Sequence, residues 1–106
     1  MVVDWGPAVR AILADLRAGV PLAVIAAAFH RGLAGAIADV AIRVGEKQVV
    51  LTGGCFQNAV LTEAVIAALR AAGLMPYWHH LVPPNDGGLA LGQAAWAASL
   101  VERGEI

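Results

Sequence analysis

The residues with the clearest chemical potential lie in the run from Pro83 to Gly88, which reads Pro-Pro-Asn-Asp-Gly-Gly. Asp86 offers a carboxylate, an oxygen ligand suited to hard and borderline cations. The prolines stiffen the approach to it, and the glycines Gly87 and Gly88 leave no side chains to block a ligand. A helical pattern begins directly afterwards, so this run predicts a ligand-binding turn at a helix N-terminus.

A second glycine pair, Gly53-Gly54, follows a short apolar run and precedes Asn58, a good N-cap for the next helix. In parallel α/β sheets, ligands bind at the carboxyl ends of strands, where helix N-termini point backbone N–H groups outward. This position predicts that Gly53 and Gly54 contact a nucleotide and that Asn58 hydrogen-bonds it. An ordinary tight turn gives the same glycine pattern, and Asp86 has the alternative role of a simple helix cap.

The histidines and the single cysteine are weaker candidates. His79 and His80 are neighbours near a predicted strand, so they point to opposite faces and cannot both readily reach one ion. We interpret both as surface residues at a strand end. His30 is interpreted as a partly buried helix histidine. Cys55 is interpreted as a small buried residue rather than a nucleophile, because no histidine lies near it in the sequence. No catalytic residue is predicted within this chain.

Apolar periodicity predicts an α/β fold in the order α-α-β-α-β-α. Counted with their capping residues, the helices cover 4–19, 21–44, 58–73 and 88–103, and the strands cover 48–52 and 76–79. The order strand, helix, strand predicts parallel strands joined by a right-handed crossover. Pro76 suits only the first position of its strand. Two strands are too few for a stable sheet, so further strands are expected from elsewhere.

Composition indicates that the chain does not bury its own apolar surface. Of its 106 residues, 59% are apolar and 14% are charged, against about 45–50% and about 25% in average soluble domains. A single small domain has too little interior for this excess. We therefore interpret the chain as a piece of a larger protein, with a covering partner chain as the alternative.

Several functional classes are disfavoured by the same sequence. The apolar stretch 20–29 and the uncharged stretch 87–101 are both shorter than the roughly 20 residues that a membrane span needs, and no secretory leader is visible. The net charge is −1, without a basic cluster, which disfavours nucleic acid as a partner. A single cysteine fits a reducing compartment, so a cytoplasmic location is expected.

Two longer strings carry a family resemblance. The string Val49–Asn58 reads Val-Val-Leu-Thr-Gly-Gly-Cys-Phe-Gln-Asn, and Val82–Gln93 reads Val-Pro-Pro-Asn-Asp-Gly-Gly-Leu-Ala-Leu-Gly-Gln. Together they resemble the C-terminal end of the HypF carbamoyltransferases, which mature nickel–iron hydrogenases. The opening helix and the helix with Phe29-His30 also fit, so the resemblance covers nearly the whole chain. This HypF region is related to TsaD and TobZ, within the actin and sugar-kinase (ASKHA) ATPase superfold.

The resemblance implies that residues 1–106 form a single partial domain, the C-terminal lobe of an ATP-dependent enzyme. In that family a carbamoyl-adenylate, derived from carbamoyl phosphate, passes its carbamoyl group to a thiolate at the C-terminus of HypE. Cys55 departs from the family's usual aliphatic residue, which argues against a general catalytic role for it. Carried over by motif, the expected ligand-binding residues are Gly53, Gly54, Asn58, Gly87 and Gly88 for the nucleotide and Asp86 for a divalent metal.

The resemblance also implies partners. HypF proteins have an acylphosphatase-like domain, zinc-binding segments, an adenylate-forming domain and a first lobe with histidine metal ligands, none of which lies in these 106 residues. We expect the chain to need that N-terminal lobe and those upstream domains, and to be inactive alone. Two alternatives stay open: a stand-alone, non-catalytic binding or assembly module with the same fold, and a fragment of a TobZ-like O-carbamoyltransferase.

Overall fold

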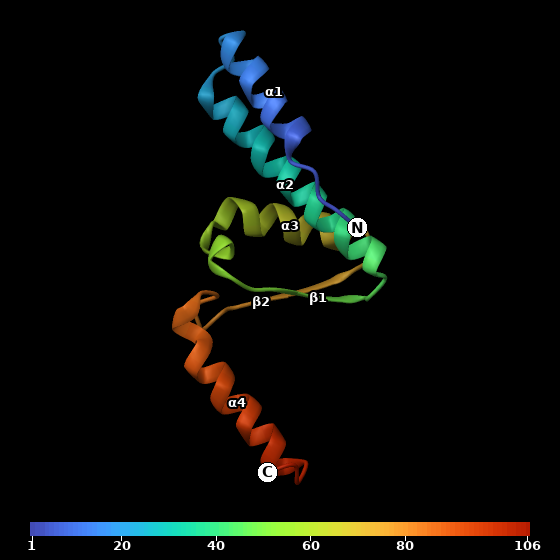
Figure 1. Ribbon diagram of the computed structural model, residues 1–106, viewed down its shortest axis with the longest axis vertical. Coiled ribbons are helices and arrows are strands. Elements are labelled where there is room, and N and C mark those ends of the chain that lie inside the picture. Colours follow the sequence, from blue (N-terminus) through green and yellow to red (C-terminus); the bar gives the residue numbers. More distant parts are fainter.

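The computed structural model describes residues 1–106 and has the predicted order of helices and strands (Figure 1). Two short 3-10 turns, η1 (Gly54–Gln57) and η2 (Asp86–Gly88), precede the last two helices. The main elements are α1 (Gly6–Arg17), α2 (Leu22–Val44), β1 (Gln48–Leu51), α3 (Ala59–Ala71), β2 (Met75–Trp78) and α4 (Leu89–Glu102).

The two strands pair in parallel, as predicted, in a register that runs from Gln48 opposite Met75 to Leu51 opposite Trp78. Pro76 lies at the second position of β2, opposite Val49, and not at the first position expected for it. The sheet has only two strands, so each strand has an open edge. A proline without an N–H is tolerated at such an edge.

Local sequence signals set the helix ends. Helix α1 is the exception, because its N-cap is Trp5, without a side-chain cap, and not Asp4 as predicted; Asp4 Oδ1 accepts a hydrogen bond of 2.9 Å from the N–H of Gly6. Gly45 ends α2 in the left-handed conformation, with φ of +84°, which costs little without a Cβ. The Asn58 side chain accepts a hydrogen bond of 3.1 Å from the N–H of Leu61 and caps α3 as predicted.

The core lies between α2, α3 and one face of the sheet. Helix α3 contributes Leu61, Val65 and Leu69, all nearly or fully buried. Helix α2 meets them with Ala34 and Ala38, whose small side chains let the two helices approach closely. Leu33 and Ile37 of α2 pack against this core and are half-buried, whereas Leu22, Phe29 and Val44 of the same helix remain exposed. This core is small: only 7 of the 106 residues are buried.

The chain is extended. Its radius of gyration is 17.6 Å, against about 13 Å for a compact domain of this length. Helix α4 extends away from the sheet, while α1 and the first half of α2 project from the opposite side (Figure 1). Neither α1 nor α4 has a buried residue, and Val50 and Tyr77 are exposed on the strands. The apolar excess seen in the composition therefore lies on the surface.

Helix α2 also satisfies a simple membrane criterion. It has 23 residues, with a mean hydropathy of 1.4 over its most apolar window, so it can span a membrane by length and composition alone. Its uninterrupted apolar stretch, residues 20–29, is shorter than a span, but the helix continues through His30 and Arg31 to Val44. The core helix of a soluble protein passes the same test, and α2 does supply Ala34 and Ala38 to the core.

We expect the isolated chain to self-associate, because its exposed apolar surface has no cover within the chain. Sedimentation velocity across a concentration series should show dimers or larger species that grow with concentration. A compact, stable monomer at tens of micromolar would contradict the interpretation that this surface is an interface.

Candidate functional site

The two glycine-bearing turns face one cavity of about 840 Å³. One wall is the carboxyl end of β1, from Thr52 to Gly54, together with His79, which directly follows β2. The other wall is the run from Pro83 to Gly88 and the first two turns of α4. The structure thus brings together five of the six predicted site residues: Gly53, Gly54, Asp86, Gly87 and Gly88.

A backbone hydrogen bond joins these two walls. The N–H of Gly53 donates to the carbonyl oxygen of Pro84 at 2.7 Å. Gly53 makes this contact with φ of +100° and ψ of 159°, a conformation that is essentially restricted to glycine. The first glycine of the pair is therefore required by the backbone geometry that closes the cavity.

The loop before α4 is held by its own side chains and by close packing. Asn85 Oδ1 accepts a hydrogen bond of 3.0 Å from the N–H of Gly87, and the N–H of Gly88 donates to the Asn85 carbonyl at 3.0 Å. A Cβ on Gly88 would lie 2.7 Å from the carbonyl oxygen of Pro83. Only glycine fits there without a shift of the backbone.

The helix-cap alternative for Asp86 is wrong. The residue before α4 is Gly88, without a side-chain cap, and Asn85 supplies the capping oxygen of η2. The Asp86 carboxylate is exposed and makes no hydrogen bond or ion pair within the chain. The chain holds no group of three histidine, cysteine or acidic residues that could bind a metal ion. Asp86 can therefore supply one ligand, and the others would have to come from outside these residues.

The structure does not place Asn58 in the cavity. Its Nδ2 donates to Nε2 of His30 at 2.9 Å, while its Oδ1 caps α3. The carbonyl oxygen of Ala26 lies 2.7 Å from Nδ1 of His30 and can only accept, so Nδ1 carries the ring proton and Nε2 accepts. The Asn58 amide is hydrogen-bonded to His30 of α2 and to Leu61 of α3, and it does not line the cavity beside Gly53 and Gly54. His30 is half-buried, as predicted.

His79 lines the cavity, although the sequence pattern predicted only a surface residue at a strand end. Its Nε2 lies 3.0 Å from Oγ1 of Thr52. The ring of His80 instead packs on Trp78, with a centroid distance of 4.9 Å. The predicted alternation of the two histidines agrees with this arrangement, but they are not equivalent surface residues. The sequence contains one signal for this position. His79 directly follows β2, which ends at the same edge of the sheet as β1.

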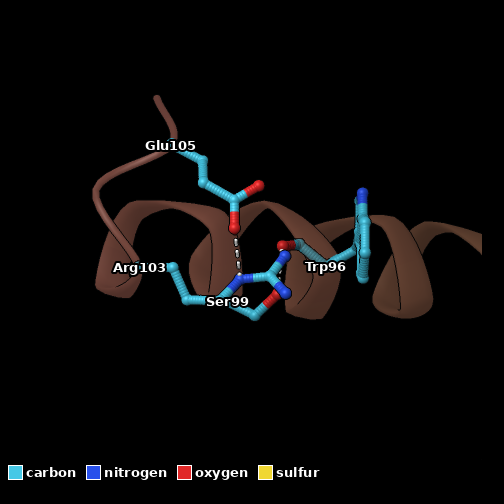
Figure 2. A network of polar contacts seen from close by, with 4 residues as sticks. All are labelled: Trp96, Ser99, Arg103 and Glu105. Atoms are coloured by element: carbon cyan, nitrogen blue, oxygen red, sulfur yellow. Dashed lines mark hydrogen bonds and ion pairs between the residues drawn. The ribbon is translucent and has the colours of Figure 1, made fainter.

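Helix α4 contributes Gln93 and Trp96 to the same cavity, which the sequence analysis also missed. The guanidinium of Arg103 lies 5.2 Å from the centre of the Trp96 ring, and its Nε is 2.9 Å from a carboxylate oxygen of Glu105 (Figure 2). Arg103 thus contacts both the Trp96 ring and Glu105 on the exposed surface of α4.

Cys55 is exposed, which corrects the expectation of a buried residue. It lies in η1, from which Phe56 is the residue that packs against the core. In so short a turn, only some side chains can reach the core. Phe56 does so, and Cys55 remains exposed. It does not line the cavity.

The family follows from comparison with known proteins. The family model described as "Carbamoyltransferase, Kae1-like Domain, second subdomain" matches residues 1–93. This match covers most of the chain, which therefore belongs to the HypF carbamoyltransferase family, in its Kae1-like domain. No solved structure matches.

Three relatives illustrate the match. Carbamoyltransferase HypF of Synechocystis sp. is 42% identical over 93 residues, covering 88% of this chain and 12% of the relative. Carbamoyltransferase HypF of Rhizobium leguminosarum bv. viciae is 46% identical over 77 residues, covering 69% of this chain and 10% of the relative. The carbamoyltransferase HypF homolog of Cupriavidus necator is 47% identical over 78 residues, covering 70% of this chain and 20% of the relative. The chain therefore spans between a tenth and a fifth of the length of these relatives.

Proposed function

We propose that this chain is the nucleotide- and metal-binding lobe of a HypF-type carbamoyltransferase, built as part of an ASKHA-type ATPase domain. The observation that carries the proposal is the joining of Gly53-Gly54 and the Pro83–Gly88 run in one cavity through the Gly53–Pro84 hydrogen bond. Membership of the carbamoyltransferase family supports the reaction class. The cavity volume of about 840 Å³ supports a ligand of nucleotide size.

In the proposed reaction, the thiolate sulfur at the C-terminus of HypE attacks the carbamoyl carbon of carbamoyl-adenylate. A carbon–sulfur bond forms, and the bond between that carbon and the adenylate phosphate oxygen breaks. AMP leaves with the electron pair of the broken bond, and the thiol has already lost its proton to solvent. The products are a carbamoyl thioester and AMP.

The glycines of this chain shape the cavity wall more than they supply hydrogen-bond donors. The N–H groups of Gly53, Gly87 and Gly88 are already engaged by Pro84 and Asn85. A Cβ on Gly87 or Gly88 would meet Asn85 or Pro83 of the same loop, so these two glycines allow its tight turn. Gly54 has open space where a Cβ would be, so its backbone is accessible to a nucleotide.

A divalent metal fits this cavity only in part. The Asp86 carboxylate is free and exposed, and its oxygen atoms suit such an ion. A bound metal would offset phosphate charge. One carboxylate does not make a metal site, so we propose that the first subdomain supplies the remaining ligands.

We propose that the same first subdomain covers the exposed faces of α4 and of the sheet, and that the assembled protein acts in the cytoplasm, without nucleic acid or membrane. The extended shape and the seven-residue core support a dependent lobe over a stand-alone binding module. The relatives are named HypF, which favours the HypE thiol as the acceptor over the acceptor of a TobZ-like O-carbamoyltransferase.

ATP binding tests this proposal. We expect the isolated chain to bind ATP weakly or undetectably, and the same chain joined to the first subdomain to bind it readily. A nucleotide held between two lobes loses about half of its contacts when one lobe is absent. Calorimetric titration of both proteins with ATP measures the difference, and micromolar affinity in the isolated chain would contradict the two-lobe site.

A further inference from the structure

We propose that His79 binds the phosphate groups of the nucleotide by donating a hydrogen bond from Nδ1 to a phosphate oxygen. The proposal rests on the nucleotide-binding function proposed above and names the residue of this lobe that recognises the charged part of the ligand. Neither the sequence pattern nor the family match assigns a role to this histidine.

The part of the cavity that this lobe supplies lacks fixed positive charge. No lysine or arginine lines it, and its one ionised residue is Asp86, whose carboxylate repels a phosphate wherever the proposed metal does not offset its charge. Phosphate binding in such a place needs donors or positive charge to offset the repulsion. His79 is the only lining side chain that can take a positive charge.

The cavity also has few free backbone hydrogen-bond donors. Glycine-rich turns commonly bind phosphate through backbone N–H groups. Here three of the lining glycines use their N–H groups within the chain: Gly53 with Pro84, and Gly87 and Gly88 with Asn85. The cavity therefore has fewer free backbone donors than its glycine content suggests, and a side-chain donor has more to contribute.

The imidazole ring of His79 has a defined partner beside the cavity. Thr52 Oγ1 lies 3.0 Å from Nε2 of His79 and fixes the imidazole beside the glycine turn. Nδ1 makes no hydrogen bond within the chain. When the Thr52 hydroxyl donates to Nε2, the neutral ring carries its proton on Nδ1 and presents a donor to the ligand. His80 packs on Trp78 and does not line the cavity.

Variants in the enzyme assembled with its first subdomain test this assignment, with ATP and adenosine as the probes in calorimetric titrations. We expect His79→Gln to weaken ATP binding about tenfold or more, because its amide replaces the Nε2 position and not Nδ1. His79→Asn, whose amide nitrogen lies near the Nδ1 position, should keep most of the affinity. Adenosine has no phosphate, so its affinity should stay unchanged in both variants.

The matched control is His80→Gln, which changes the same residue type one position away and should leave both affinities unchanged. Thr52→Val should weaken ATP binding by a smaller factor, about threefold, because the ring keeps Nδ1 but loses its anchor. The thermal unfolding of each variant shows whether a loss of affinity is caused by a loss of folded structure. If the His79 variants do not fold, full ATP affinity in Thr52→Val overturns the proposal.

The outcomes separate this inference from the proposed function. A wild-type enzyme that binds no ATP overturns both. A wild-type enzyme that binds ATP, with equal affinity in His79→Gln, overturns the inference alone. Equal losses for ATP and adenosine would indicate a structural role. A fall in bound metal in His79→Gln would make His79 a metal ligand, which also overturns the assignment.

Discussion

Replacing Asp86 by asparagine in the assembled enzyme is expected to reduce carbamoyl transfer at least about tenfold, a loss of about 1.4 kcal/mol in transition-state stabilisation. The change removes an anionic oxygen while keeping the size of the side chain. Stability should be nearly unchanged, because the carboxylate makes no hydrogen bond or ion pair within the chain. The measurements are carbamoylation of the HypE thiol, bound metal and the thermal unfolding midpoint.

The control for this prediction is Asp39→Asn. Asp39 is an exposed carboxylate on α2, outside the cavity. Its replacement makes the same change of charge and should leave transfer and metal content as in the wild type. If Asp86→Asn keeps both wild-type transfer and wild-type metal content, Asp86 is an ordinary surface carboxylate and the metal proposal fails.

Replacing Gly53 by alanine is expected to destabilise the assembled protein by about 1–3 kcal/mol. The cause is the backbone conformation, with φ of +100°, and not a clash, since nothing lies within 4 Å of the added Cβ. If the backbone at residue 53 shifts to relieve this conformational strain, it also disturbs the hydrogen bond of 2.7 Å to the Pro84 carbonyl, which joins the cavity walls. Denaturant unfolding followed by circular dichroism measures the free energy of unfolding.

Gly54→Ala is the matched control at the neighbouring position. Gly54 does not have a positive φ and also has open space around its Cβ position. We expect a small change in stability, within about 0.5 kcal/mol. ATP affinity should fall if the nucleotide approaches the Gly54 backbone as proposed. Equal destabilisation by the two substitutions would show that the conformation of Gly53 is not what requires glycine.

The features that the sequence predicted correctly depend on a few neighbouring residues. Asn58 caps α3 because its side chain reaches an N–H three residues ahead. Gly73 follows the end of α3 with φ of +77°, because a left-handed residue costs least there when it has no Cβ. The parallel pairing of the strands follows from the helix between them. The predicted boundaries shifted by a residue or two, as at Pro76, because pairing and not composition decides where a strand begins.

By itself, the sequence determined the α/β order, the Asn58 cap of α3, the two glycine turns and the apolar excess, because each depends on local spacing or on composition. The tertiary structure decided which residues meet. It joined Gly53 to Pro84, directed His79 and not His80 into the cavity, and turned Asn58 away from it toward His30. These contacts join residues 27 to 31 positions apart. Such contacts form only after the helices and strands pack, so no local pattern specifies them.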